Sequence, residues 1–86
     1  MEIVLSAKAQ DDLDRLARSN PKIEQNVRAH LRRLPAAYRS DPMLRGIFRG
    51  YRRHRVGAYR VIYRTDPETD TLLIVRIGHC REIYDR

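Results

Sequence analysis

The hydrophobic pattern changes its period near the middle of the chain, and this change constrains the fold more than any other feature. In the first half, apolar residues recur at the spacing of amphipathic helices: Leu13, Leu16 and Ala17, then Ile23, Val27, Leu31 and Leu34. In the second half, the segments 59–64 and 71–77 are rich in the β-branched and aromatic residues that favour strands. The order of helices followed by strands predicts an α+β fold.

Two helices are predicted in the first half, joined by a tight turn. Ser6 is placed to cap the first helix, and Asn20 followed by Pro21 is typical of the start of the second. We expect the second helix to end at about Leu34, because Pro35 follows. The segment 35–46 is predicted to be a loop, since it holds two prolines and a glycine.

Three consecutive antiparallel strands are predicted in the second half. The pair Gly57–Ala58 suits a two-residue hairpin turn between 50–56 and 59–64, and the segment 65–70 has turn chemistry. The apolar run 2–5 supplies a fourth strand. We therefore expect one domain over residues 1–86, with two N-terminal helices on one face of a small, mainly antiparallel four-stranded sheet.

The hairpin turn fixes which side chains share a face of the sheet. If Gly57 and Ala58 are the loop residues, Val56 pairs with Tyr59, and directly opposite side chains point to the same face. The face predicted to pack on the helices carries Arg52, His54, Val56, Tyr59, Val61 and Tyr63. The other, predicted to be open, is called here the arginine face and carries Tyr51, Arg53, Arg55, Arg60, Ile62 and Arg64. Like charges placed opposite each other destabilise a sheet, so this cluster suggests a bound anion.

The charge of the chain points to the same class of partner. The 86 residues carry a formal charge of +7, with 16 arginines and 2 lysines, and the segment 44–64 holds seven arginines and no acidic residue. Arginine binds phosphate in bidentate fashion and stacks on bases, so arginines interleaved with tyrosines favour a nucleic-acid partner over a merely solvated basic surface.

Several classes of site and location are not expected. The single cysteine, Cys80, excludes an intramolecular disulfide, and the three scattered histidines lack ligand spacing, so neither a metal nor a cofactor is predicted. The chain has no apolar run of membrane-spanning length and no signal-peptide pattern, so we expect a cytoplasmic protein without a membrane partner.

The combination of RVGAYRVIYR at 55–64 with RIGHCREIY at 76–84, preceded by the run Leu-Arg-Gly at 44–46, resembles the RelE branch of the RelE/ParE toxin superfamily. The resemblance covers nearly the whole chain. It implies the toxin of a type II toxin–antitoxin system: a metal-independent endoribonuclease that cuts mRNA in the ribosomal A site and halts translation. It also implies a cognate antitoxin as partner, RelB-like or similar, and operator DNA as a partner of the complex.

The resemblance suggests roles for individual positions. Arg53 and Arg55 match basic residues of the family's second strand, Arg60 matches the basic residue after the hairpin, and Tyr84 matches a tyrosine that stacks on the substrate base. Cys80 stands where many members have arginine, and the neighbouring Arg81 is a candidate substitute. Further RNA contacts are expected from Arg45, Arg49, Tyr51 and Arg64.

The chemistry of RNA cleavage leaves the general base open. The 2′-oxygen must lose a proton and the developing phosphorane charge must be stabilised, which suits Arg53, Arg55 and Arg60. Arginine is a poor proton acceptor, so His79 is the candidate base or orienting group. We expect His54 to face the helices and His30 to be a surface or boundary residue.

Two alternatives to RNA cleavage remain at this point. A ParE-like toxin would use the same scaffold to inhibit DNA gyrase without nuclease activity. A catalytically weak module would bind only nucleic acid or its antitoxin, and Tyr84 would then serve C-terminal packing.

Overall fold

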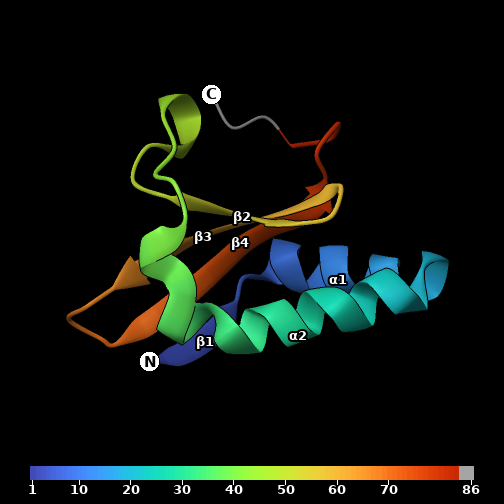
Figure 1. The fold of residues 1–86 in the computed structure, drawn as a ribbon, viewed down its shortest axis with the longest axis horizontal. Coiled ribbons are helices and arrows are strands. Elements are labelled where there is room, and N and C mark those ends of the chain that lie inside the picture. The colour runs from blue at the N-terminus through green and yellow to red at the C-terminus, as the bar shows by residue number, and fades with distance from the viewer. Residues whose placement is uncertain (84–86) are drawn as a thin grey trace.

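The computed structural model describes residues 1–83 and confirms the predicted α+β fold, in which two helices cover one face of a four-stranded sheet (Figure 1). The elements in chain order are β1 (Glu2–Leu5), α1 (Ala7–Ser19), α2 (Pro21–Ala37), the 3₁₀ turns η1 (Tyr38–Ser40) and η2 (Gly46–Phe48), β2 (Arg52–Val56), β3 (Tyr59–Asp66) and β4 (Thr71–His79). The strand order is β1-β4-β3-β2. β1 runs parallel to β4, and the other neighbours are antiparallel.

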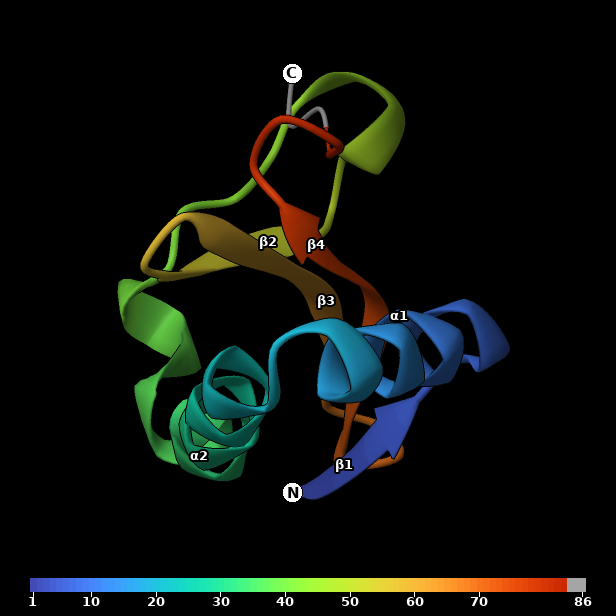
Figure 2. The same cartoon turned by 90° about the vertical axis from the view of Figure 1, so that its right-hand side faces the viewer.

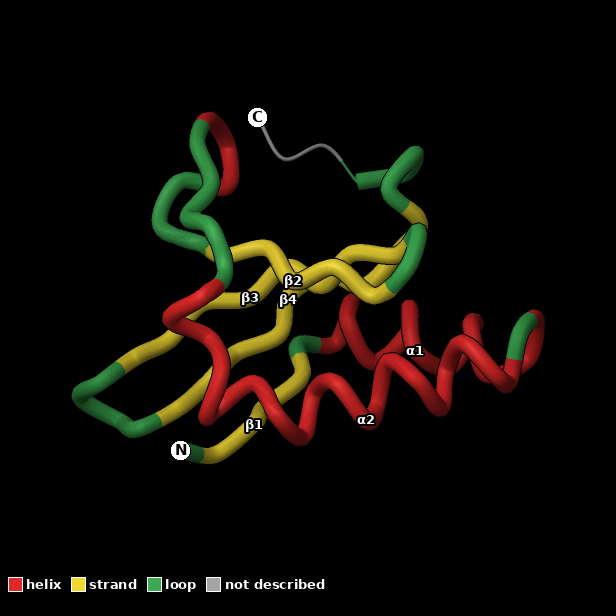
Figure 3. Tube along the Cα trace, viewed as in Figure 1, coloured by secondary structure: helices red, strands yellow, loops and turns green. Residues whose placement is uncertain are grey.

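Side-chain caps set the start of both helices, as the sequence predicts. The Ser6 Oγ accepts a hydrogen bond from the Ala9 N–H at 3.1 Å and begins α1. Asn20 ends α1 through its own N–H, and its side chain accepts from the Ile23 N–H to begin α2. One residue therefore joins the two helices, which lie side by side on the same face of the sheet (Figures 2 and 3). Among residues 1–83, no helix has the length and apolar character needed to cross a membrane.

The predicted end of the second helix is wrong, because α2 continues through Pro35 to Ala37. Proline removes one backbone donor, but this occurs in the last turn, where little of the helix follows. The helical hydrogen bonds resume after the proline, since the Tyr38 N–H donates to the Leu34 carbonyl. The buried Leu34 side chain holds this end of the helix against the core. The segment 35–46 is therefore only partly a loop, since it contains the end of α2, the whole of η1 and the first residue of η2.

The β2–β3 hairpin has the register that the turn predicts. Val56 pairs with Tyr59 and Arg55 with Arg60, and the pairing ends at Arg52 with Tyr63, so the pair expected beyond it does not form. Gly57 has φ of +60°, the left-handed region that a two-residue turn beginning with glycine requires.

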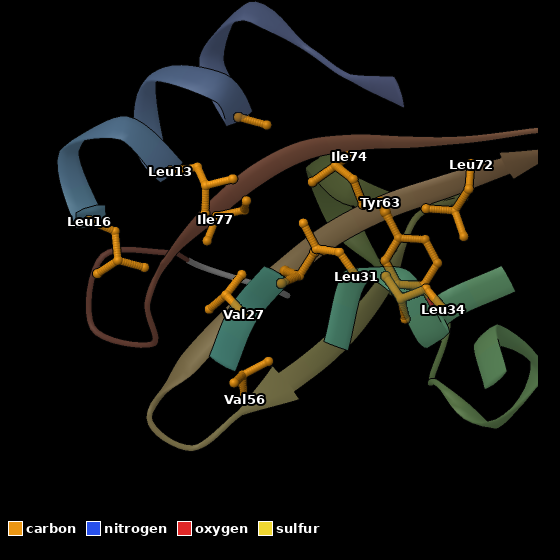
Figure 4. Close-up of a cluster of buried hydrophobic side chains, with 12 residues drawn as sticks. Leu13, Leu16, Val27, Leu31, Leu34, Val56, Tyr63, Leu72, Ile74 and Ile77 are labelled. Carbon is orange, nitrogen blue, oxygen red and sulfur yellow. The ribbon is translucent and has the colours of Figure 1, made fainter. Parts of the chain in front are cut away.

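The main core lies between the helices and the sheet (Figure 4). Leucines and a valine of α1 and α2 meet apolar side chains of β2, β3 and β4 there. The cluster contains Leu13, Leu16, Val27, Leu31, Leu34, Val56, Val61, Tyr63, Leu72, Ile74 and Ile77, with Ala9 beside them. Each large side chain buried in this way contributes about 1.5–3 kcal/mol.

Polar groups of the first helix complete the edge of β4 where the short β1 has ended. The Asp12 carboxylate, only 7% exposed, accepts from the Ile77 N–H at 2.9 Å and from the Arg76 Nε at 3.2 Å. The Ser6 hydroxyl donates to the Val75 carbonyl. These contacts tie α1 to the central strand and satisfy backbone groups that would otherwise lack partners.

Candidate nucleic-acid interface

Most arginines of β2 and β3 lie on the face of the sheet opposite the helices, while Arg52 lies on the helix side with Asp41. Arg55 lies directly across from Arg60, and Arg53 lies across from Ile62. Arg55 and Arg64 are exposed, and Arg53 and Arg60 are half-buried. The pairs Arg53–Ile62 and Arg55–Arg60 of the arginine face therefore have the predicted register, and guanidinium groups of this kind bind phosphate oxygens in bidentate fashion.

The centre of the arginine face is not open, contrary to the expectation from the sequence. Ile62 is 0% exposed, because Leu44 and Ile83 cover it in a second, small apolar cluster. The chain folds back at the Leu44 N–H, which donates to the Tyr51 carbonyl at 2.8 Å. Gly78 leaves room for Ile83, since a Cβ at this position would lie 3.0 Å from the Ile83 Cδ1. Local sequence could not show this, because the covering residues come from distant parts of the chain.

Two segments rise on either side of the arginine face, away from the helices (Figure 1). The first contains η2, with the exposed Arg45 and Arg49 on its flanks and Ile47 86% exposed at its tip. The second is the turn that follows β4, in which the Glu82 N–H donates to the His79 carbonyl. The arginines near the hairpin are thus framed by one basic loop and by the C-terminal turn.

Tyr51 belongs to the small apolar cluster. Its ring lies edge-on to Phe48, with 6.2 Å between the ring centroids. The Arg64 guanidinium lies 6.0 Å from the centroid of the same ring. The structure thus brings Tyr51 and Arg64 together, and the tyrosine ring packs against Phe48 and the small apolar cluster.

His79 lies on the other side of the sheet from the arginines. It pairs with Tyr59, and the two rings meet edge to face with their centroids 5.4 Å apart. Its Nδ1 accepts a hydrogen bond from the Arg81 N–H at 3.1 Å, so in the neutral ring the proton is on Nε2. Register thus places His79 with Tyr59, and its Nδ1 lone pair is already used; its role as a base or orienting group stays a prediction.

The other C-terminal candidates have simple surroundings. Arg81 is exposed in the turn, and Cys80 is half-buried, with its N–H donating to the Ala58 carbonyl at 2.9 Å. The Cys80 Sγ lies 3.9 Å from the His79 Nδ1. Tyr84, the predicted stacking residue, lies outside the described residues.

A polar cluster on the helix side was missed at the sequence level, except that His54 was expected to face the helices. The Asp41 carboxylate accepts from the Tyr63 hydroxyl at 2.5 Å and from the His54 Nδ1 at 3.0 Å. The His54 Nε2 lies 2.8 Å from the Nδ1 of His30, which is half-buried, in keeping with the expected surface or boundary position. Burial, followed by the bond to Asp41, raises the pKa of Tyr63 far above its ordinary value. The alternation of β2 is the signal that could have found the cluster, since a polar side chain facing the core needs a partner.

A small pocket of about 140 Å³ lies elsewhere, between α1 and the end of β4. Its lining includes Asp12, Glu82 and Tyr59, together with one cation, Arg15. Two carboxylates against one guanidinium make this pocket a poor site for phosphate, so it is not the candidate interface. Within residues 1–83, no group of three or more histidine, cysteine, aspartate or glutamate side chains is arranged so that it could hold a metal ion.

A family model described as the ParE toxin of the type II toxin–antitoxin system parDE matches residues 3–84. The chain belongs to this family. The match includes the whole hairpin with its arginines and both segments that frame the arginine face. No curated protein sequence matches the chain.

Solved structures place this toxin-family chain among RelE-like and YoeB-like folds. The RelBE2 toxin–antitoxin complex of Mycobacterium tuberculosis contains a chain that is 32% identical, with a TM-score of 0.74, covering 91% of this chain and 95% of that one. The YoeB/ParE toxin of Agrobacterium tumefaciens has a TM-score of 0.79 at 18% identity, covering 92% and 98%. YafQ of E. coli has a TM-score of 0.75 at 23% identity, covering 96% and 97%, and these last two show the fold alone.

Proposed function

We propose that this toxin is a ribosome-dependent endoribonuclease that cleaves mRNA in the A site and thereby inhibits translation. The observation that carries the proposal is the arginine cluster near the hairpin turn, where Arg55 faces Arg60 across two strands and Arg53 is two residues away. Stability alone disfavours such a pair, whereas an RNA phosphate between the guanidinium groups would stabilise it.

The arginines supply electrostatic stabilisation in the proposed reaction. The 2′-hydroxyl loses its proton to solvent and its oxygen attacks the adjacent phosphorus. The bond from phosphorus to the 5′-oxygen breaks, the 5′-oxygen takes up a proton from solvent, and a 2′,3′-cyclic phosphate remains. Arg53, Arg55 and Arg60 hold the phosphate and offset the charge that develops on its oxygens. The described residues place no histidine beside them, which fits an enzyme that depends on the ribosome to align the 2′-oxygen with the phosphate.

A cognate antitoxin is the proposed protein partner. The 32% identical neighbour is the toxin of a complex with its antitoxin. A chain with a net charge of +7 would attract an acidic antitoxin segment. This segment would cover the arginine face and become ordered when it binds. The complex is the proposed form that binds operator DNA, and the free toxin is the proposed form that acts on ribosomes in the cytoplasm.

Primer extension on mRNA held in programmed ribosomes tests the proposal. We expect new 5′ ends within the A-site codon when the protein is present, and intact RNA when the ribosome is omitted. Arg60→Ala should lower the cleavage rate about 10²-fold, as the loss of one transition-state donor does in other enzymes. Arg32→Ala, at an exposed position of α2, is the matched control and should cleave like the unchanged protein.

Inhibition of DNA gyrase is the second candidate, because the matching family model is that of ParE. Intact mRNA together with loss of supercoiling by purified gyrase would replace the first proposal with this one. Growth arrest that persists in both Arg60→Ala and Tyr84→Ala would also count strongly against RNA cleavage.

A further inference from the structure

The polar cluster on the helix side joins four separate parts of the chain. His30 comes from α2, His54 from β2, Asp41 from the segment after η1, and Tyr63 from β3. Their contacts run in sequence from His30 Nδ1 to His54 Nε2 at 2.8 Å, from His54 Nδ1 to Asp41, and from the Tyr63 hydroxyl to Asp41 at 2.5 Å. The Asp41 and His54 side chains are 14% and 19% exposed, so the bonds form in a largely water-excluded place.

The hydrogen bonds limit how many protons the histidine pair can hold. The Asp41 carboxylate accepts only, so the His54 Nδ1 carries a proton. Between the facing nitrogens of His54 and His30, one must donate and the other accept. Two neutral rings satisfy this, and so does the pair with one additional proton. With two additional protons both facing nitrogens carry hydrogen, so the bond is lost and two positive charges face each other at hydrogen-bond distance.

The surrounding charges oppose protonation of His30. Burial first, then the neighbouring His54 and Arg33, lower the pKa of His30 below its ordinary 6.5. Other charged or titratable groups beside the cluster, among the described residues, include Arg52, whose guanidinium donates to the Asp41 carbonyl at 2.8 Å. Its guanidinium and that of Arg39 lie over the Tyr38 ring. Because the unfolded chain binds the His30 proton at a higher pH than the folded chain, the stability of the fold falls as the pH drops below about 6.5.

β2 is the strand that this cluster would hold. It lies at the end of the sheet, with β3 on one side and only the 42–44 segment on the other, through the Met43–Arg52 bridge and the bond from the Arg53 N–H to the Pro42 carbonyl. His54 stands between Arg53 and Arg55 in the sequence, so its side chain points to the helices while theirs point to the arginine face. A strand anchored through His54 keeps both arginines in place on its opposite side.

We propose that His30, Asp41, His54 and Tyr63 are positioning residues that fix β2, and with it Arg53 and Arg55, and that they release the strand when the histidine pair takes up its second additional proton. The part of this inference that concerns the arginines rests on the proposed function. The cluster itself does not, since its effect on β2 is measurable without RNA.

Amide hydrogen exchange followed by NMR tests the cluster directly. In the unchanged protein, lowering the pH from 7.5 to 5.5 should reduce the protection of the β2 amides, corrected for intrinsic exchange, about tenfold or more. The protection of the amides that join β1 to β4 should change less. His30→Asn places an amide where the imidazole Nδ1 stood and does not titrate, so β2 should keep its protection in this variant. Gln25→Ala, at an exposed position of the same helix, should behave like the unchanged protein.

Two results would overturn the cluster's role. One is β2 protection that is the same at both pH values in the unchanged protein. This result is measured without any variant. The other is an equal loss in the unchanged protein and in His30→Asn, which would assign the acid effect to groups outside the pair.

Cleavage on programmed ribosomes separates this inference from the proposed function. The ratio of the rate for the unchanged protein to the rate for His30→Asn cancels the pH dependence of the ribosome itself. We expect the ratio to fall about tenfold from pH 7.5 to pH 5.5, in step with β2 protection. A ratio that stays constant while β2 is released would refute the positioning role. Absence of cleavage in both proteins would refute the proposed function, and hydrogen exchange would still decide whether the cluster holds β2.

Discussion

Arg55 and Arg60 place two positive charges opposite each other near the turn of a hairpin. Like charges placed opposite each other lower the stability of the hairpin, while the same two charges raise its affinity for phosphate. Arg55→Gln removes one charge and keeps a side chain of similar length. We expect its free energy of unfolding, measured in urea, to be unchanged or raised by up to about 1 kcal/mol, while its affinity for single-stranded RNA falls.

Arg39→Gln is the matched control for this change, because Arg39 is exposed in η1, away from the arginine face. A loss of RNA affinity in Arg39→Gln as large as in Arg55→Gln would mean that overall charge, and not the arginine face, determines binding.

Asp12 makes a second prediction at the residue scale. Its carboxylate accepts from the Ile77 N–H and Arg76, and it also lies 3.3 Å from the Lys8 Nζ. Asp12→Ala leaves the backbone donor of a buried strand without its acceptor. We expect a loss of about 1.5–3 kcal/mol in the free energy of unfolding, the range for hydrogen bonds to charged groups.

Asp11→Ala tests whether this cost comes from burial. Asp11 is exposed and forms an ion pair with Arg15 one turn along the same helix, so its loss should cost about 0.3–0.5 kcal/mol. Equal effects of the two changes in thermal or urea unfolding would contradict the role given to Asp12.

At the scale of elements, the two-residue turn between β2 and β3 aligns the arginines. Gly57 has φ of +60°, and a Cβ there would meet nothing within 4 Å. Gly57→Ala therefore introduces only backbone strain, which should cost about 1–2 kcal/mol. The loss is measurable by urea unfolding, and Ala58→Gly serves as the comparison. A stable Gly57→Ala variant would mean that the turn relaxes to another conformation, and NMR contacts between Val56 and Tyr59 would then show a changed register.

The helix α2 shows how packing overrides a local stop signal. Pro35 costs a hydrogen bond near the end of the helix, but the buried Leu34 and the resumed bond at Tyr38 favour continuing it to Ala37. This continuation carries the chain on toward Asp41, where the carboxylate meets His54 and Tyr63. The end of α2 thus positions a group on which the polar cluster depends.

At the scale of the whole molecule, the net charge of +7 predicts strongly salt-dependent RNA binding. If about three phosphates are neutralised, the logarithm of the association constant should fall against the logarithm of salt with a slope of roughly −2 for single strands. Arg60→Ala should make the slope shallower by about 0.7. Fluorescence anisotropy with a short RNA at several salt concentrations measures both values, and a flat dependence would contradict phosphate binding.

The sequence alone determined the features that depend on neighbours along the chain. The caps at Ser6 and Asn20, the hairpin register at Gly57 and the alternation of arginines on β2 and β3 were all predictable, because each follows from local geometry and a fixed side-chain period. The order of helices and strands followed from the change in hydrophobic period. The resemblance carried by the two C-terminal motifs agreed with the family that the chain belongs to.

Only the tertiary structure decided which distant residues meet. The covering of Ile62 by Leu44 and Ile83, the place of His79 beside Tyr59, and the contact of His30 with His54 each join parts of the chain that lie far apart in sequence. Such contacts depend on how helices pack on the sheet and where loops fold back. A periodic pattern gives the buried face of an element but not the element that covers it, so these features appear only when the whole chain is folded.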